Sequence, residues 1–62
     1  MNAIATKYGT FNVTDNGNGG VALYHGEKKV FDHNNIPWWN TDAILDVLDK
    51  NKEVIIKKVG ER

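Results

Sequence analysis

The chain has 62 residues, which is enough for one domain and close to the size below which a domain needs disulfides or metals to fold. It contains no cysteine, so disulfides and cysteine-ligated zinc are excluded, and 40% of its residues are hydrophobic, too many for a disordered segment. We therefore expect residues 1–62 to form one compact domain. Eight basic residues balance eight acidic ones, whereas a general nucleic-acid-binding domain carries a basic excess, so a partner other than nucleic acid is expected.

The first half of the chain has the composition of strands separated by turns. Residues 4–13 are rich in β-branched and aromatic side chains without a helical period, which predicts a strand, and Gly9 within it indicates a bulge or a close approach by another side chain. Two Asn-Gly pairs within residues 14–20 predict a hairpin connection. A second strand is predicted at residues 21–25 and, after a tight turn, a third at residues 28–32.

The glycine-rich loop also spells two binding motifs that its context rejects. Residues 17–22 fit the pattern G-x-G-x-x-A, but a dinucleotide site needs a helix directly after the glycines, and a strand is predicted here. A calcium loop of the EF-hand type needs glycine at position six and glutamate at position twelve, and starting at Asp15 or Asn16 supplies only one of the two. We therefore interpret this loop as a turn.

One amphipathic helix is predicted at residues 41–50. Pro37 cannot lie inside a helix, and Asn40 is a suitable N-cap because its side-chain oxygen can accept from a free backbone N–H of the first turn. Asn51 is predicted as a left-handed C-cap. The cap at Asn40 puts Trp39 and Ile44 in the positions of a hydrophobic staple, so we expect the Trp39 ring to be buried.

The last segment, residues 53–59, contains a β-branched run and is predicted as a strand. The order is then β-β-β-α-β, an α+β fold in which one helix packs on one face of a mainly antiparallel sheet. The predicted core comprises Ile44, Val47, Leu48, Val54 and Ile56, facing Phe11, Leu23 and Phe31.

Catalysis, metals and cofactors have little support in the residue inventory. The chain has neither serine nor cysteine, the usual activated nucleophiles, and its two histidines, His25 and His33, lie in different predicted elements without metal-ligand spacing. Asp32 could complete a set of three ligands, but no motif joins the three residues. We expect no enzyme activity, no metal and no cofactor.

The tandem tryptophans are the most informative feature for binding. Two adjacent side chains cannot both face inward where the chain enters a helix, so if Trp39 is buried then Trp38 points outward, and an exposed aromatic side chain on a small protein is typical of a binding site. The predicted partner-binding residues are Trp38, Ile36, His33, Asp42 and Asp46. The aspartates lie on the polar face of the helix, where they could meet a basic partner.

Three functions follow as hypotheses. The first is a protein-binding module that occupies a surface of a larger protein, as an inhibitor or adaptor; this size and composition are typical of viral or phage accessory proteins. The second is single-stranded nucleic-acid binding, by Tyr8, Tyr24 and Lys29 on one sheet face with a basic end at residues 52–62. The third is a homodimeric structural or assembly subunit. Because the N-terminus lacks signal-peptide features and no apolar run reaches membrane-spanning length, we expect the cytoplasm and no membrane partner.

Overall fold

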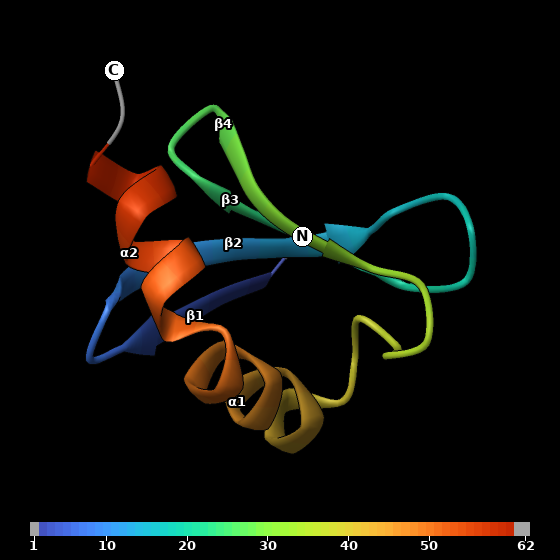
Figure 1. The fold of residues 1–62 in the computed structure, drawn as a ribbon. Coiled ribbons are helices and arrows are strands. Elements are labelled where there is room, and N and C mark those ends of the chain that lie inside the picture. Colours follow the sequence, from blue (N-terminus) through green and yellow to red (C-terminus); the bar gives the residue numbers. More distant parts are fainter. Residues whose placement is uncertain (1, 61–62) are drawn as a thin grey trace.

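The computed structural model describes residues 2–60, which form a four-stranded antiparallel sheet followed by two helices (Figure 1). The elements are β1 (Asn2–Thr6), β2 (Gly9–Asp15), β3 (Val21–His25), β4 (Lys28–His33), α1 (Thr41–Lys50) and α2 (Lys52–Gly60). The strands pair in sequence order, β1-β2-β3-β4. Four antiparallel strands and two helices agree with the expected α+β composition, whereas the predicted order β-β-β-α-β is wrong because both helices follow the strands.

The predicted first strand, residues 4–13, is a hairpin of β1 and β2. The chain turns at Lys7 and Tyr8, and Gly9 begins β2 with a φ of 128°, a conformation that side chains disfavour. The hydroxyl of Thr6 accepts from the Tyr8 N–H at 3.0 Å and donates to the Gly9 carbonyl at 2.8 Å. Gly9 therefore lies at the exit of a turn. Of the two predictions made for it, the mid-strand bulge is wrong, whereas the close approach of another side chain is confirmed, because a Cβ at Gly9 would stand 3.8 Å from the His25 ring.

The predicted last strand, residues 53–59, is the helix α2. Of its three consecutive β-branched residues only Ile55 is buried, while Val54 and Ile56 are 52% and 54% exposed. The predicted strand placed Val54 and Ile56 together on the core face, whereas in α2 Ile55 faces the core and its two neighbours point away from it. Val59, four residues further, packs against the same core. The assignment of Val54 and Ile56 to the core is therefore wrong.

Asn51 joins the two helices. Its backbone N–H donates to the carbonyls of Val47 and Leu48 at 3.1 and 3.2 Å, and its side-chain amide donates to the Val47 carbonyl at 2.8 Å. Its own carbonyl accepts from the Ile55 N–H at 3.1 Å, the first bond of the next helix. Its φ of −116° is not left-handed, so the predicted cap conformation is wrong. The chain therefore enters α2 at once and does not return to the sheet.

Helix α1 has the predicted bounds, and the Asn40 side chain accepts from the Ala43 N–H at 3.1 Å, as an N-cap does. Its buried residues, Ile44 and Leu48, join Ile55 in covering one face of the sheet. The strands contribute Phe11, Val13, Val21, Leu23 and Val30 to this core. The predicted core positions Phe11, Leu23, Ile44 and Leu48 are confirmed, whereas Val47 is half-buried and Phe31 packs at the margin of the core.

The other face of the sheet carries small and polar side chains. Since Val13 and Leu23 face the core, their neighbours Asn12 and Tyr24 point to the opposite side, where the two are paired across β2 and β3. Tyr24 also pairs with Lys29 of β4, next to an irregularity in the register. Figure 1 shows both helices on the covered side, so this second face remains open.

Candidate partner-binding surface

Trp38 and Trp39, called here the tryptophan corner, lie on a turn between β4 and α1. The Asn40 N–H donates to the Pro37 carbonyl at 3.1 Å, which closes a four-residue turn with the two tryptophans at its central positions. Asn40 also caps α1 by accepting from Ala43. Proline at one end and a helix cap at the other therefore hold the backbone of the corner.

Both rings of the corner are exposed, Trp38 by 39% and Trp39 by 67%. The predicted staple between Trp39 and Ile44 is therefore wrong, although Ile44 is fully buried. The physical reason is the turn, because its central residues project away from the core. Ile36, which precedes the turn, packs against the core instead.

The Trp38 side chain lines a hollow of about 310 Å³ together with Val13, Thr14 and Asp15, at the end of β2. The Asp15 Oδ1 accepts from the Gly17 N–H at 3.1 Å, which fixes the carboxylate. These β2 residues are not among the predicted partner-binding residues. Only the arrangement of the corner against the sheet brings them to Trp38, and no local pattern signals it.

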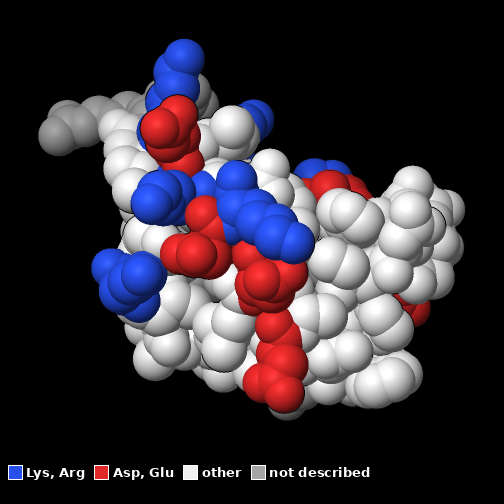
Figure 2. All heavy atoms as spheres, turned by 60° about the horizontal axis from the view of Figure 1, so that its bottom comes forward, with Lys and Arg blue, Asp and Glu red and all other residues white. Residues whose placement is uncertain are grey.

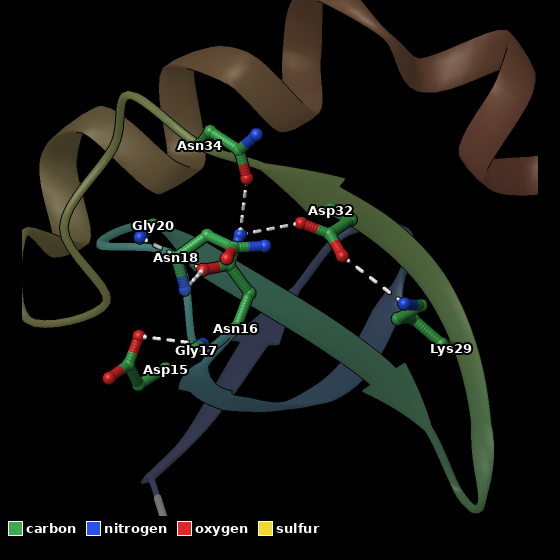
Figure 3. Close-up of polar contacts among 8 residues, drawn as sticks. All are labelled: Asp15, Asn16, Gly17, Asn18, Gly20, Lys29, Asp32 and Asn34. Atoms are coloured by element: carbon green, nitrogen blue, oxygen red, sulfur yellow. Dashed lines mark hydrogen bonds and ion pairs between the residues drawn. The ribbon is translucent and has the colours of Figure 1, made fainter.

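A hydrogen-bond network around Asn16 anchors the loop that follows Asp15 (Figure 3). The Asn16 Nδ2 donates to Asp32 Oδ1 at 2.7 Å and to Asn34 Oδ1 at 2.8 Å. Its Oδ1 accepts from the N–H groups of Asn18 and Gly20, at 2.8 and 3.0 Å. These hydrogen bonds connect the loop to the end of β4. They also hold the backbone next to Asp15, which lines the hollow.

The remaining predicted site residues divide into half-buried and exposed ones. His33 is half-buried, stacks on Phe31 with ring centroids 6.1 Å apart, and accepts through Nδ1 from the Asn35 N–H at 3.1 Å. Ile36 is half-buried as well. Asp42 and Asp46 of α1 are exposed. Asp42 and Asp46 are thus accessible to a partner, and Ile36 is only partly so.

The acidic face of α1 is defined by Asp42, Asp46 and Asp49. Figure 2 shows a band of acidic side chains on the side of the molecule where α1 lies, with lysines on one side of the band and an uncharged area on the other. Asp46 pairs with Lys50 at 3.1 Å. Asp42 has no ion pair within the described part of the chain, so it is the aspartate of this face most open to a partner's cation.

Asp49 is engaged with the turn between β1 and β2. Its Oδ1 accepts from the Tyr8 hydroxyl at 2.7 Å and lies 3.6 Å from the Lys7 ammonium. The hydrogen bond from Tyr8, followed by the Lys7 charge, lowers the pKa of Asp49, and the same hydrogen bond raises the pKa of Tyr8. Tyr8 therefore lies on the helix side of the sheet, so Tyr8, Tyr24 and Lys29 do not share one face.

A metal site has no geometric support in residues 2–60, because no three histidine or acidic side chains gather there to hold an ion. The register places His33 opposite Val21 and His25 opposite Lys28, at opposite ends of the β3–β4 pair. Neither described helix has the length and apolar character that crossing a membrane requires. Arg62, part of the predicted basic end, lies outside the described residues.

Comparison with known proteins gave no match to a protein family, to a curated sequence or to a solved structure.

Proposed function

We propose that the chain is a protein-binding module that occupies a surface of a larger protein, as an inhibitor or adaptor, with the tryptophan corner as its central contact. The observation that supports this proposal is the exposure of both rings on a turn whose backbone is fixed at each end. Exposing two large aromatic side chains costs hydrophobic free energy that a partner would recover by covering them.

The energetics of such a contact are favourable because the corner is held in place before binding. A tryptophan has few rotatable bonds and a large surface, and aromatic anchors of this kind commonly contribute 2 kcal/mol or more to an interface, to order of magnitude. Asp42, without an ion pair in the described chain, adds a rim contact for a basic residue. Charge at the rim mainly speeds association and selects the partner.

The two other hypotheses have weaker support. The platform proposed for single-stranded nucleic acid loses Tyr8, whose hydroxyl is bonded to Asp49 on the helix side. Tyr24 and Lys29 remain on the open face, but one aromatic side chain makes a poor stacking platform. For a homodimer closed by exposed apolar side chains, Val54 and Ile56 of α2 are available, whereas the open sheet face carries small and polar side chains that provide little hydrophobic free energy.

The experiment compares three immobilised proteins with an extract of cells that express the chain. They are the wild type, the corner variant Trp38→Ala/Trp39→Ala and the control variant Val54→Ala/Ile56→Ala, which removes two exposed apolar side chains from α2. A candidate partner is a protein that the wild type captures specifically, and we expect the control to capture it as well and the corner variant not to.

The captured protein is then purified and titrated against each variant. We expect the corner variant to lose at least ~2 kcal/mol of binding free energy, about thirtyfold in Kd, and the control to bind as the wild type does. Circular dichroism should show all three proteins folded. A partner that binds the corner variant with unchanged affinity would place the interface elsewhere and contradict the proposal.

A further inference from the structure

The hollow beside the tryptophan corner combines an indole ring with a carboxylate. Trp38 and Asp15 both line it, and Val13 and Thr14 supply the rest of the wall. Trp38 is 39% exposed and Asp15 is exposed, so a ligand can reach both groups from solvent. The volume of about 310 Å³ lies at the lower end of the range for small-molecule sites, which suits a single long side chain.

The Asp15 carboxylate is oriented and has one oxygen available. Its Oδ1 accepts from the Gly17 N–H at 3.1 Å, whereas its Oδ2 accepts no hydrogen bond from residues 2–60. The Asn16 network holds the loop that contains Gly17, the donor to this carboxylate. An anchored carboxylate with a free oxygen is a ready acceptor for a charged donor.

An aromatic ring next to a carboxylate favours a guanidinium group over other ligands. Arginine stacks its planar, weakly hydrated cation on an aromatic face while its N–H groups donate to a carboxylate, and lysine offers only a compact and strongly hydrated charge. An anion would be repelled by Asp15, and a purely apolar side chain would leave the carboxylate without its donor. The described chain itself places no cation on Asp15.

We infer that this hollow is the binding site for an arginine side chain of the partner protein, held between the Trp38 indole and the Asp15 carboxylate. The inference rests on the proposed function, since it names the chemistry that a partner presents to the corner. Charge complementarity supports it: residues 1–50, which include the hollow and α1, carry four lysines against six acidic residues, a net charge of −2.

The test uses N-acetyl-arginine amide as the probe and N-acetyl-citrulline amide as its uncharged near-isostere. Because the chain contains only two tryptophans, Trp39→Phe leaves Trp38 as the single indole, and its side-chain N–H signal can be followed by NMR. We expect the arginine probe to shift the signals of Trp38, Asp15 and Gly17 in a saturable manner, and the citrulline probe to bind at least about tenfold more weakly.

Two variants test the two walls separately. Asp15→Asn keeps an oxygen that can accept from Gly17 but removes the charge, and we expect about a tenfold loss of arginine binding with unchanged citrulline binding. Trp38→Leu keeps an apolar side chain and should weaken arginine binding as well. Equal binding of the two probes, or an unchanged affinity of Asp15→Asn, would overturn the inference.

The outcome also separates this inference from the proposed function. If arginine fails to bind at the hollow while the corner variant still loses its partner, the protein-binding function stands and the arginine site does not. If arginine binds as expected but the corner variant keeps its partner, the hollow binds arginine, while the proposed function and the assignment of that arginine to the partner are both wrong. Saturable shifts confined to Asp42, Asp46 and Asp49 would assign the cation to the acidic face and overturn the hollow as its site.

Discussion

Replacing Ile55 by alanine tests which face of α2 packs against the core, and so separates α2 from the strand predicted with Val54 and Ile56 inward. Ile55 is fully buried against the core, whereas its neighbour Ile56 is 54% exposed. If the segment were a strand, Ile56 and not Ile55 would face the sheet together with Val54. The pair Ile55→Ala and Ile56→Ala therefore reports which side of the chain faces inward.

The expected magnitudes differ widely. Truncating a buried isoleucine to alanine costs roughly 2–5 kcal/mol, through lost burial and the cavity that remains. A domain of 62 residues has a total stability of roughly 3–9 kcal/mol, so Ile55→Ala removes a large share of it. Ile56→Ala should change stability by less than ~0.5 kcal/mol, since it removes an exposed side chain and improves helix propensity.

The assay is urea unfolding followed by far-ultraviolet circular dichroism, which reports the backbone. Tryptophan emission is less suitable, because both rings are already exposed in the folded protein. The measured quantity is the free energy of unfolding from the midpoint and slope of each curve. A large loss for Ile56→Ala together with a neutral Ile55→Ala would refute the helix and restore the predicted strand.

Three further predictions concern the corner, the acid response and the loop. The two residues of the tryptophan corner are the only tryptophans of the chain, and both are exposed. Iodide should therefore quench the tryptophan fluorescence of the native protein almost as well as that of the urea-unfolded protein. A strongly blue-shifted fluorescence that iodide does not quench would contradict the exposed corner. The pKa of Asp49 is lowered in the folded protein, so its hydrogen bond with Tyr8 stabilises the fold above the unfolded-state pKa, and this stabilisation is lost as pH falls through the folded-state pKa. Tyr8→Phe should therefore flatten the acid side of a plot of Tm against pH. An unchanged plot would argue against the hydrogen bond. A Cβ at Gly20 would collide with the His33 carbonyl, so Gly20→Ala should cost at least ~2 kcal/mol in urea unfolding, whereas Gly60→Ala, which meets nothing within 4 Å, should be neutral or stabilising.

Helix α1 was predictable because its signals are local. Pro37 and Asn40 mark where it begins, and the spacing of Ile44 and Leu48 identifies its buried face, so bounds and core positions agree with the structure. Each of these signals acts within a few residues of the helix. These signals can be recognised without information from the rest of the chain.

Helix α2 was not predictable because local preference and tertiary context disagree. The run of three β-branched residues at 54–56 favours a strand. In the structure the Asn51 carbonyl provides the first acceptor of a new helix, and this helix buries Ile55 in the core. The burial of Ile55 and the cap at Asn51 together outweigh the preference of β-branched residues for strands. That preference is worth less than about 1 kcal/mol per residue.

The candidate site was predictable in part. The sequence indicated Trp38 as an exposed anchor, but the staple rule assigned Trp39 to the core, whereas the turn from Pro37 to Asn40 exposes it. Asp15, the acidic residue that lines the hollow, could not be predicted from the sequence, because its position beside Trp38 depends on how the corner packs against β2. Contacts between distant segments carry no periodic or local signature.

The order of the strands has a consequence for how fast the chain folds. Each strand of the meander pairs with its neighbour in the sequence, and the two helices are consecutive, so most backbone pairing closes only short loops. Short loops cost little entropy, and chains dominated by such local contacts reach the native state quickly. We therefore expect the strands to pair early and Ile44, Leu48 and Ile55 to cover the apolar face of the sheet afterwards.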